Sequence, residues 1–183
     1  MKLFGKFRLN IGNRLLRKKI DTNRRTVSYS NIDNVRNIGV VWDASDPKEF
    51  KNISAFYTKM GQRGINVKVI GFYDQKELPG EFTAIHYFTC LKRDDLSFFF
   101  KPLTPESETF IDEKFDVLID INFKNVFPLR YITSMSRGSM KVGLYREGDS
   151  APFDLMIDQR EPTVEEYLEQ VIHYLEMINN TTD

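Results

Sequence analysis

The chain has 183 residues, of which 41% are hydrophobic and 13% aromatic, a composition typical of one folded globular domain and not of a disordered segment. Its single cysteine, Cys90, excludes an internal disulfide, so we expect a reducing compartment, the cytoplasm. No window approaches the roughly 20 apolar residues of a membrane span, and the basic N-terminus lacks the apolar run of a secretory signal.

The net charge of zero hides an asymmetry between the start of the chain and the rest. Residues 1–26 carry nine Lys and Arg against one Asp, whereas the remainder carries 17 basic and 25 acidic side chains. Such an arm predicts contact with a protein or anionic partner, either RNA or the ribosome, or a membrane surface; the alternative is docking on its own acidic body. The candidate partner-binding residues are Lys2, Lys6, Arg8, Arg14, Arg17, Lys18, Lys19, Arg24 and Arg25.

Residues 3–20 have helical composition, but their apolar side chains form two partial faces in place of one stripe. These faces are Phe4, Phe7, Ile11 and Leu15 on one side and Leu9, Leu16 and Ile20 on the other. Gly12-Asn13 between the halves predicts a bend or a break. A membrane-surface helix usually shows one wide apolar face, so the pattern favours docking between protein surfaces. We predict a helical arm over 1–26, a polar linker over 27–35 and one domain over 36–183.

Residues 38–73 predict a first strand–helix–strand unit. The continuous apolar run IGVVW (38–42) is typical of a strand buried on both faces of a parallel sheet. The segment DPKE (46–49) combines a cap, a first-turn proline and a glutamate, which is a strong helix start, and Gly64 predicts the helix end. The run VKVIGFY (67–73) predicts the second strand.

The next forty residues are less regular. The run AIHYFT (84–89) predicts a third strand, whose direction the sequence leaves open. Phe98–Phe100 predict core beneath a long loop, because large exposed apolar patches are rare on monomers. Thr104-Pro105 predicts the start of a short helix that ends near Glu113.

Residues 115–145 predict a second strand–helix–strand unit, with strands over 116–121 and 141–145 and a helix that begins at Pro128. A short sixth strand (154–158) and a last helix with a capping box at 163–166 follow. Right-handed crossovers then predict an α/β fold: a single three-layer Rossmann-like domain with a mostly parallel, five- to six-stranded sheet in the order 3-2-1-4-5, preceded by a basic N-terminal helix.

In such a sheet, ligands bind beyond the carboxyl ends of the strands where the strand order reverses, here between the first and fourth strands. The candidate ligand-binding residues at this edge are Asp43, Ser45, Asp120, Asn122 and Arg146. Asp120 is the most informative, because it interrupts an apolar strand and a buried carboxylate needs a partner. That partner is either a ligand hydroxyl or a cation, or it belongs to the fold, as an ion pair with Arg146 or Arg130 or as backbone amides.

Other chemistry has little support in the sequence. Neither GxGxxG nor GxxxxGK[ST] occurs, and the acidic turn after the first strand disfavours a dinucleotide or ATP. His86, His173 and Cys90 make no zinc set, and no nucleophilic triad or DNA-binding motif is present. We predict no catalytic residue, metal or cofactor. The leading hypothesis is a non-catalytic module that docks through its basic helix; the alternative is a binding protein or enzyme for a sugar or nucleotide-like molecule.

Several segments resemble a bacterial family of small proteins of unknown function. They are FDVLIDI (115–121), the serine-rich turn SMSRGSMKVGL (134–144), DLMID (154–158) and the basic helical start. The resemblance covers residues 1–178 and implies a single cytoplasmic domain without established catalytic residues. A fainter likeness is to the N-terminal half of heptosyltransferase-type glycosyltransferases. Those enzymes place catalysis between two such domains, and this chain supplies one, so no catalytic residue is carried over.

Overall fold

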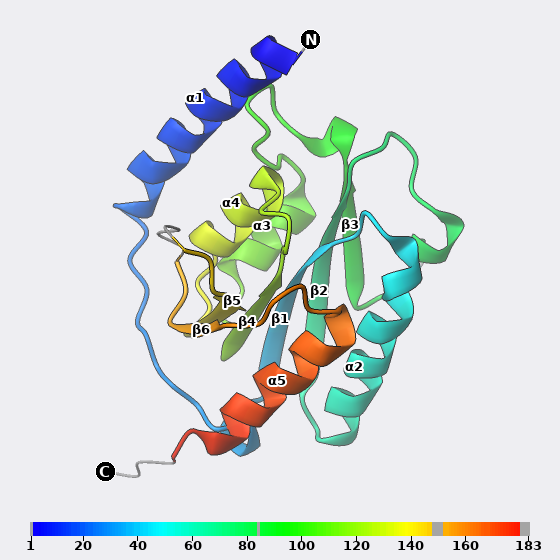
Figure 1. Ribbon diagram of the computed structural model, residues 1–183, viewed down its shortest axis with the longest axis vertical. Helices are drawn as coiled ribbons and strands as arrows, with labels where there is room; N and C mark the ends of the chain where they lie inside the picture. Colours follow the sequence, from blue (N-terminus) through cyan, green and yellow to red (C-terminus); the bar gives the residue numbers. More distant parts are fainter. Residues whose placement is uncertain (1, 84, 148–151, 180–183) are drawn as a thin grey trace.

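The computed structural model describes residues 2–83, 85–147 and 152–179 (Figure 1). Six strands form one parallel sheet in the order β3-β2-β1-β4-β5-β6. The strands are β1 (Asn37–Asp43), β2 (Asn66–Tyr73), β3 (Phe88–Lys92), β4 (Val117–Ile121), β5 (Met140–Leu144) and β6 (Leu155–Ile157). The predicted parallel α/β sheet and its strand order are confirmed, and β6 extends the sheet beyond β5.

Helices cover both faces of the sheet (Figure 1). The helices are α1 (Lys2–Ile20), α2 (Phe50–Gln62), α3 (Pro105–Asp112), α4 (Phe127–Met135) and α5 (Val164–Met177). α2 and α5 pack on the face to which Val40 and Trp42 point, whereas α3 and α4 pack on the face to which Val41 points. α1 lies outside α4, so this second face carries two layers of helix.

The helix starts form as their sequences predict. The Asp46 side chain accepts a hydrogen bond from the Lys48 N–H at the 3₁₀ turn Pro47–Glu49, which leads into α2. At the start of α5, Thr163 accepts from the Glu166 N–H while the Glu166 carboxylate accepts from the Thr163 N–H. These caps satisfy N–H groups that have no partner within the helix.

The sequence left open a bend or a break at Gly12-Asn13, and the break does not occur, because α1 is continuous through Gly12. At this glycine α1 lies close against the body. A Cβ atom there would lie 2.6 Å from the Phe99 carbonyl oxygen and 3.0 Å from the Phe127 ring. Gly12 is therefore required for contact, and the helix tolerates its lower propensity.

The third strand lies four residues later than predicted, at Phe88–Lys92 and not at 84–89, and Ala84 falls outside the described residues. It runs parallel to β2, with Tyr73 opposite Lys92, so that both strands end at the same edge of the sheet. The Asp95 carboxylate accepts from the Lys92 N–H and ends the strand. The register is set by pairing with β2, which a local apolar run does not reveal.

The expectation that Phe98–Phe100 form core is also wrong. Phe98 is 55% exposed, and Phe99 and Phe100 are half-buried. The loop that carries them lies beneath the first turns of α1, where Phe98 packs edge-on against Phe4. These rings are partly covered by a helix that the sequence reading treats as a separate arm.

The segment after α1 also packs on the body. Ile32 and Val35 are buried, and the Asn31 amide donates to the carbonyls of Glu176 and Ile178 at the end of α5. A 3₁₀ turn, Ile32–Asn34, leads into β1. Among the described residues, no helix is both long and apolar enough to cross a bilayer.

Candidate functional site

The carboxyl edge of β1 and β4 holds the five residues singled out from the sequence. The two strands are adjacent and parallel, with Val41 opposite Asp120. Asp43 is the last residue of β1 and Asn122 directly follows β4, so both lie at this edge. Their side chains do not converge on one crevice. Asp43 and Ser45 lie on one side of the edge, and Asp120, Asn122 and Arg146 line a separate recess.

Asp43 and Ser45 share a lysine that the sequence reading missed. The Asp43 carboxylate accepts from the Ser45 N–H at 3.1 Å, and the Lys124 ammonium lies 3.6 Å from its second oxygen and also donates to the Ser45 hydroxyl. All three line a cavity of about 260 Å³. Lys124 is on the loop after β4. Its position three residues beyond the strand is the one feature of the sequence that could have placed it at this edge.

Asp120 is used within the fold. It is 5% exposed, and its carboxylate accepts hydrogen bonds from the Asn122 N–H, at 2.8 Å, and from the Thr133 hydroxyl on α4. The Asn122 side chain in turn donates to the Val126 carbonyl and accepts from the Val126 N–H. These bonds hold the β4–α4 turn closed.

Arg146 completes this recess by donating to the Asn122 carbonyl at 2.6 Å. The remaining space is about 10 Å³, which is room for roughly one water molecule. Asp120 also acts through the sheet, because burial first and this negative charge second raise the pKa of Tyr167 on α5. The geometry of Asp120, Asn122 and Arg146 is that of an internal hydrogen-bond network.

A cavity of about 550 Å³ lies beneath the first half of α1. Phe72 and Asp74 at the end of β2 border it, as do Phe100 of the loop, Phe127 of α4 and Arg8 of α1. Except for Arg8, which it assigned to partner contact, the sequence reading did not connect these residues with a site. They come from four distant segments and share no local pattern.

The basic arm docks on α4 through its inner face. Leu16 is buried against Phe127 and Tyr131, and the Arg130 guanidinium donates to the Asn13 side chain. Lys19 lies over the Tyr131 ring and within 3.4 Å of its hydroxyl. The self-docked arrangement is thus the one that the structure shows.

The outer face of α1 combines cations with apolar side chains. Phe4 and Phe7 are each 60% exposed and Leu15 is 46% exposed. Of the nine basic residues of the arm, Arg8 and Arg25 are half-buried, and the side chain of Lys2 lies outside the part that the structure describes. The exposed basic residues are Lys6, Arg14, Arg17, Lys18, Lys19 and Arg24. Of the two apolar faces in the sequence, the one with Leu16 is docked and the one with Phe4, Phe7 and Leu15 is exposed. Ile20 and Ile11 depart from this division, because Ile20 is exposed and Ile11 is half-buried.

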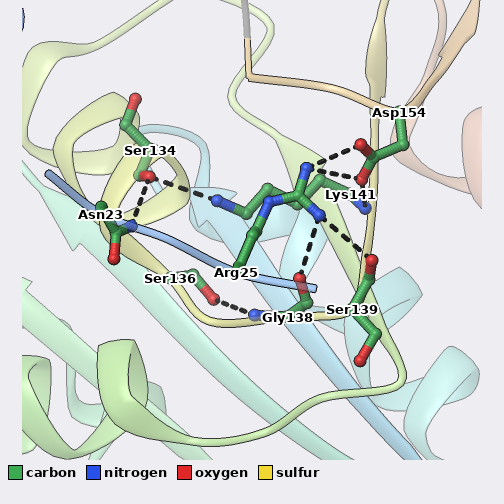
Figure 2. Close-up of polar contacts among 8 residues, drawn as sticks. All are labelled: Asn23, Arg25, Ser134, Ser136, Gly138, Ser139, Lys141 and Asp154. Carbon is green, nitrogen blue, oxygen red and sulfur yellow. Dashed lines mark hydrogen bonds and ion pairs between the residues drawn. The ribbon is translucent and has the colours of Figure 1, made fainter. Parts of the chain in front are cut away.

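The end of the arm is fixed by Arg25 at the amino edge of the sheet (Figure 2). Its guanidinium donates to both carboxylate oxygens of Asp154, at 2.6 and 2.8 Å, and to the carbonyls of Gly138 and Ser139. The Asp154 carboxylate also accepts from the Lys141 N–H. Both bonds to Asp154 come from one guanidinium nitrogen, Nη2, while Nη1 donates to the two carbonyls, so the orientation of the side chain is fixed from two sides.

Lys141 is a buried cation beside this pair (Figure 2). Its ammonium donates to the Ser134 carbonyl in the last turn of α4, where Asn23 also donates, and only 1% of the residue is exposed. Burial first, and then the positive charge of Arg25, lower the pKa of Lys141 to about 7 against the opposing effect of Asp154. In the sequence, the sign that Lys141 is unusual is its position within the apolar strand β5. Such a pKa suits a nucleophile, but the amine is buried and bonded to the Ser134 carbonyl, so it has no access to a substrate in this structure.

Other reactive groups give no centre. Within the described ranges, no three His, Cys, Asp or Glu side chains gather as metal ligands. Burial, and secondarily the charge of Asp95, raise the pKa of the Cys90 thiol to about 12, so it stays protonated. The His86 ring bonds to the Tyr57 hydroxyl, and His173 lies exposed on α5.

Comparison with known proteins agrees with the resemblance of the sequence to a family without assigned activity. Residues 8–178 match a family described as a family of unknown function, DUF6913. No curated protein matches the chain. The match covers α1 from Arg8 onward, the six strands of the described sheet and α5, so most of α1 lies within the matched region. The chain belongs to this family of unknown function.

Proposed function

We propose that the protein is a non-catalytic interaction module that binds an anionic membrane surface through the outer face of α1. The observation that carries the proposal is the exposure of Phe4, Phe7 and Leu15 beside cations on a helix whose other face is already docked. Interfacial helices show this combination of apolar and basic side chains. The split apolar pattern, which argued against a membrane helix, is explained by the two roles of α1.

The placement of the cations fits a flat anionic surface. Phe7, Arg14 and Lys18 are spaced so that they fall on nearly one line along the helix. Arg and Lys extend their charges from long apolar stems, so a ring beside them reaches the acyl boundary while the charges stay among headgroups. Each cation near an anionic membrane contributes about 1 kcal/mol.

The rest of the chain favours one orientation. Residues 27–183 carry 25 acidic against 17 basic side chains, so an anionic membrane repels the body and attracts α1. The aromatic patch of Phe4, Phe7 and Phe98, at the start of α1, would then face the membrane. Phe98 comes from the loop under α1, so the contact surface exists only in the docked arrangement.

Vesicle co-sedimentation of the full chain tests the proposal. We expect binding to vesicles that contain phosphatidylglycerol, weak binding to phosphatidylcholine vesicles, and weakening with added salt. The double variant Arg14→Gln/Lys18→Gln should lose about 2 kcal/mol, or about thirtyfold in affinity. The matched control Lys51→Gln/Lys59→Gln removes two exposed cations from α2 and should bind like the parent.

Two further variants, each of which removes one exposed apolar side chain, test the apolar part of the proposed membrane surface. Phe7→Ser should weaken binding at least fivefold, whereas Met177→Ser, which removes an equally exposed apolar side chain (61%) at the end of α5, should not. Equal binding to neutral and anionic vesicles contradicts the proposal. Binding to single-stranded RNA without binding to vesicles would assign the basic face to nucleic acid instead.

A further inference from the structure

We propose that the cavity between α1 and the carboxyl edge of β2 binds an amphipathic anion, a small molecule in which an anionic group is joined to an apolar ring or chain. The site is on the inner side of α1 and is separate from the proposed membrane surface. It lies beyond the carboxyl end of β2, at the same edge of the sheet as the switch point between β1 and β4 where α/β sheets usually bind ligands.

The size and walls of the cavity suit a small molecule. Its volume of about 550 Å³ falls within the roughly 300–1,000 Å³ of known ligand sites. Phe72 of β2, Leu96 and Phe100 of the loop, Phe127 of α4 and Leu9 of α1 supply apolar walls. Such walls favour an aromatic ring or a short hydrocarbon chain.

Arg8 is held in a fixed orientation on one wall. Its Nε donates to the Phe98 carbonyl at 2.6 Å, and its guanidinium lies over the Phe98 and Phe100 rings, 4.4 and 4.5 Å from their centroids. A guanidinium restrained by rings and a carbonyl is pre-organised, so less entropy is lost when it binds an anion.

The charge at the cavity is positive. Lys6, Arg8 and Arg93 border it together with one carboxylate, Asp74, which pairs with Arg93 at 2.9 Å. In the part of the chain that the structure describes, no carboxylate forms an ion pair with Arg8 or Lys6. The lining of the cavity therefore combines its apolar side chains with two cations, Lys6 and Arg8, whose charge the described part of the fold does not neutralise.

Gly5 leaves room for the ligand. It lies in the lining, and a Cβ atom built on it would meet no atom within 4 Å. Gly12, on the same side of the helix two turns later, meets Phe99 and Phe127 closely. The helix thus stands off the body at Gly5 and touches it at Gly12.

Calorimetric titration of the full chain with matched probes tests the proposal. The probes are 1-naphthyl phosphate and 1-naphthoate, compared with 1-naphthol and inorganic phosphate, which each carry half of the recognised chemistry. We expect saturable binding of at least one naphthyl anion, at least tenfold tighter than either half. The stronger of the two anions distinguishes a phosphate from a carboxylate ligand.

Two variants locate the binding. Arg8→Gln should weaken the naphthyl anion at least tenfold. Gly5→Leu should abolish binding by filling the space, and it should fold at least as well as the parent because leucine favours helix and its Cβ meets nothing. Arg160→Gln, which removes an exposed cation elsewhere, is the control and should bind normally.

The result that overturns the proposal is the absence of saturable binding by either naphthyl anion, or binding that survives Gly5→Leu. The outcome is independent of the membrane surface, since Phe7→Ser should bind the naphthyl anion like the parent while losing vesicle affinity. Each proposal therefore stands or fails on its own measurement.

Discussion

Two arginines of the N-terminal segment, Arg8 and Arg25, are both half-buried against the body but have different surroundings. Arg25 meets the Asp154 carboxylate and two carbonyls, so its charge is neutralised by the fold. Arg8 meets two rings and one carbonyl, and among the described residues it has no carboxylate. One is an anchor, and the other is available to an anion.

This difference shows that the density of basic residues along a chain does not tell which of them stabilise the fold and which are available to bind a ligand. In the sequence, both arginines belong to one basic run with the same expected role. The partner is supplied by a segment more than a hundred residues away for Arg25 and by a loop for Arg8. The predictions below test this contrast.

The largest expected loss of stability from a single substitution is at Arg25. Arg25→Gln leaves the Asp154 carboxylate, which is mostly buried, without its ion pair, so the free energy of unfolding should fall by about 3 kcal/mol. Urea unfolding measures the change. Arg24→Gln next to it, an exposed position, should change stability by no more than about 0.5 kcal/mol. Similar free energies of unfolding for the two variants would show that Arg25 does not anchor the arm.

The contact at Gly12 should give the next effect. Gly12→Ala places a methyl group 2.6 Å from the Phe99 carbonyl oxygen, so docking of α1 should weaken by about 2 kcal/mol despite better helix propensity. Gly5→Ala in the same helix has no such contact and should be stabilising by about 0.5–1 kcal/mol. The rate of trypsin cleavage within α1 measures both. Changes of the same sign would contradict the docked geometry.

The Lys141 amine should make stability depend on pH. Its pKa is lowered to about 7 in the folded state, from 10.5, so between these values the unfolded chain binds more protons. The free energy of unfolding therefore rises with pH from about 7 to about 10, by at most roughly 1.4 kcal/mol per pH unit. Below about pH 7 both states are protonated, and the cost of burying the charge is constant.

Lys141→Met should remove this slope and should stabilise the protein at pH 6, where the buried charge is otherwise retained. Urea unfolding at several pH values measures the difference between variant and parent. The control Lys51→Met, at an exposed position of α2, should keep the parent slope. A parent profile that stays flat between pH 7 and 10 relative to Lys141→Met would show that the amine stays charged in the folded state.

The smallest effect should be on Arg8. Arg8→Gln removes two ring contacts and one hydrogen bond but leaves no carboxylate unpaired, so stability should fall by about 1 kcal/mol. Urea unfolding beside Arg25→Gln makes the comparison direct. A loss as large as that of Arg25→Gln would place Arg8 among the anchors and weaken the case for a ligand.

Most of the fold could be predicted from local patterns. The buried runs at 38–42 and 116–121 and the cap at Asp46 each act within a few residues, so they survive in the sequence. The same applies to the capping box at Thr163. β3 was placed four residues early because its position depends on pairing with β2, which is a property of two segments.

The candidate site was less predictable. Asp120 was correctly identified as a carboxylate in need of a partner, and backbone amides such as the Asn122 N–H were among the partners considered. The Thr133 hydroxyl is recognisable as a partner only when α4 lies over β4. The cavity under α1 was missed because its walls come from four segments. The Phe98–Phe100 run was assigned to the core for the same reason, since nothing local indicates that a helix covers it.

The sequence by itself determined the parallel α/β sheet, its strand order and the basic helix, because buried strands, caps and charge runs are encoded within short stretches. Only the tertiary structure decided which face of α1 docks, that Arg25 is neutralised while Arg8 is not, and where the cavity lies. These features depend on distances between segments far apart in the chain. Such distances are fixed by packing, which no local pattern records.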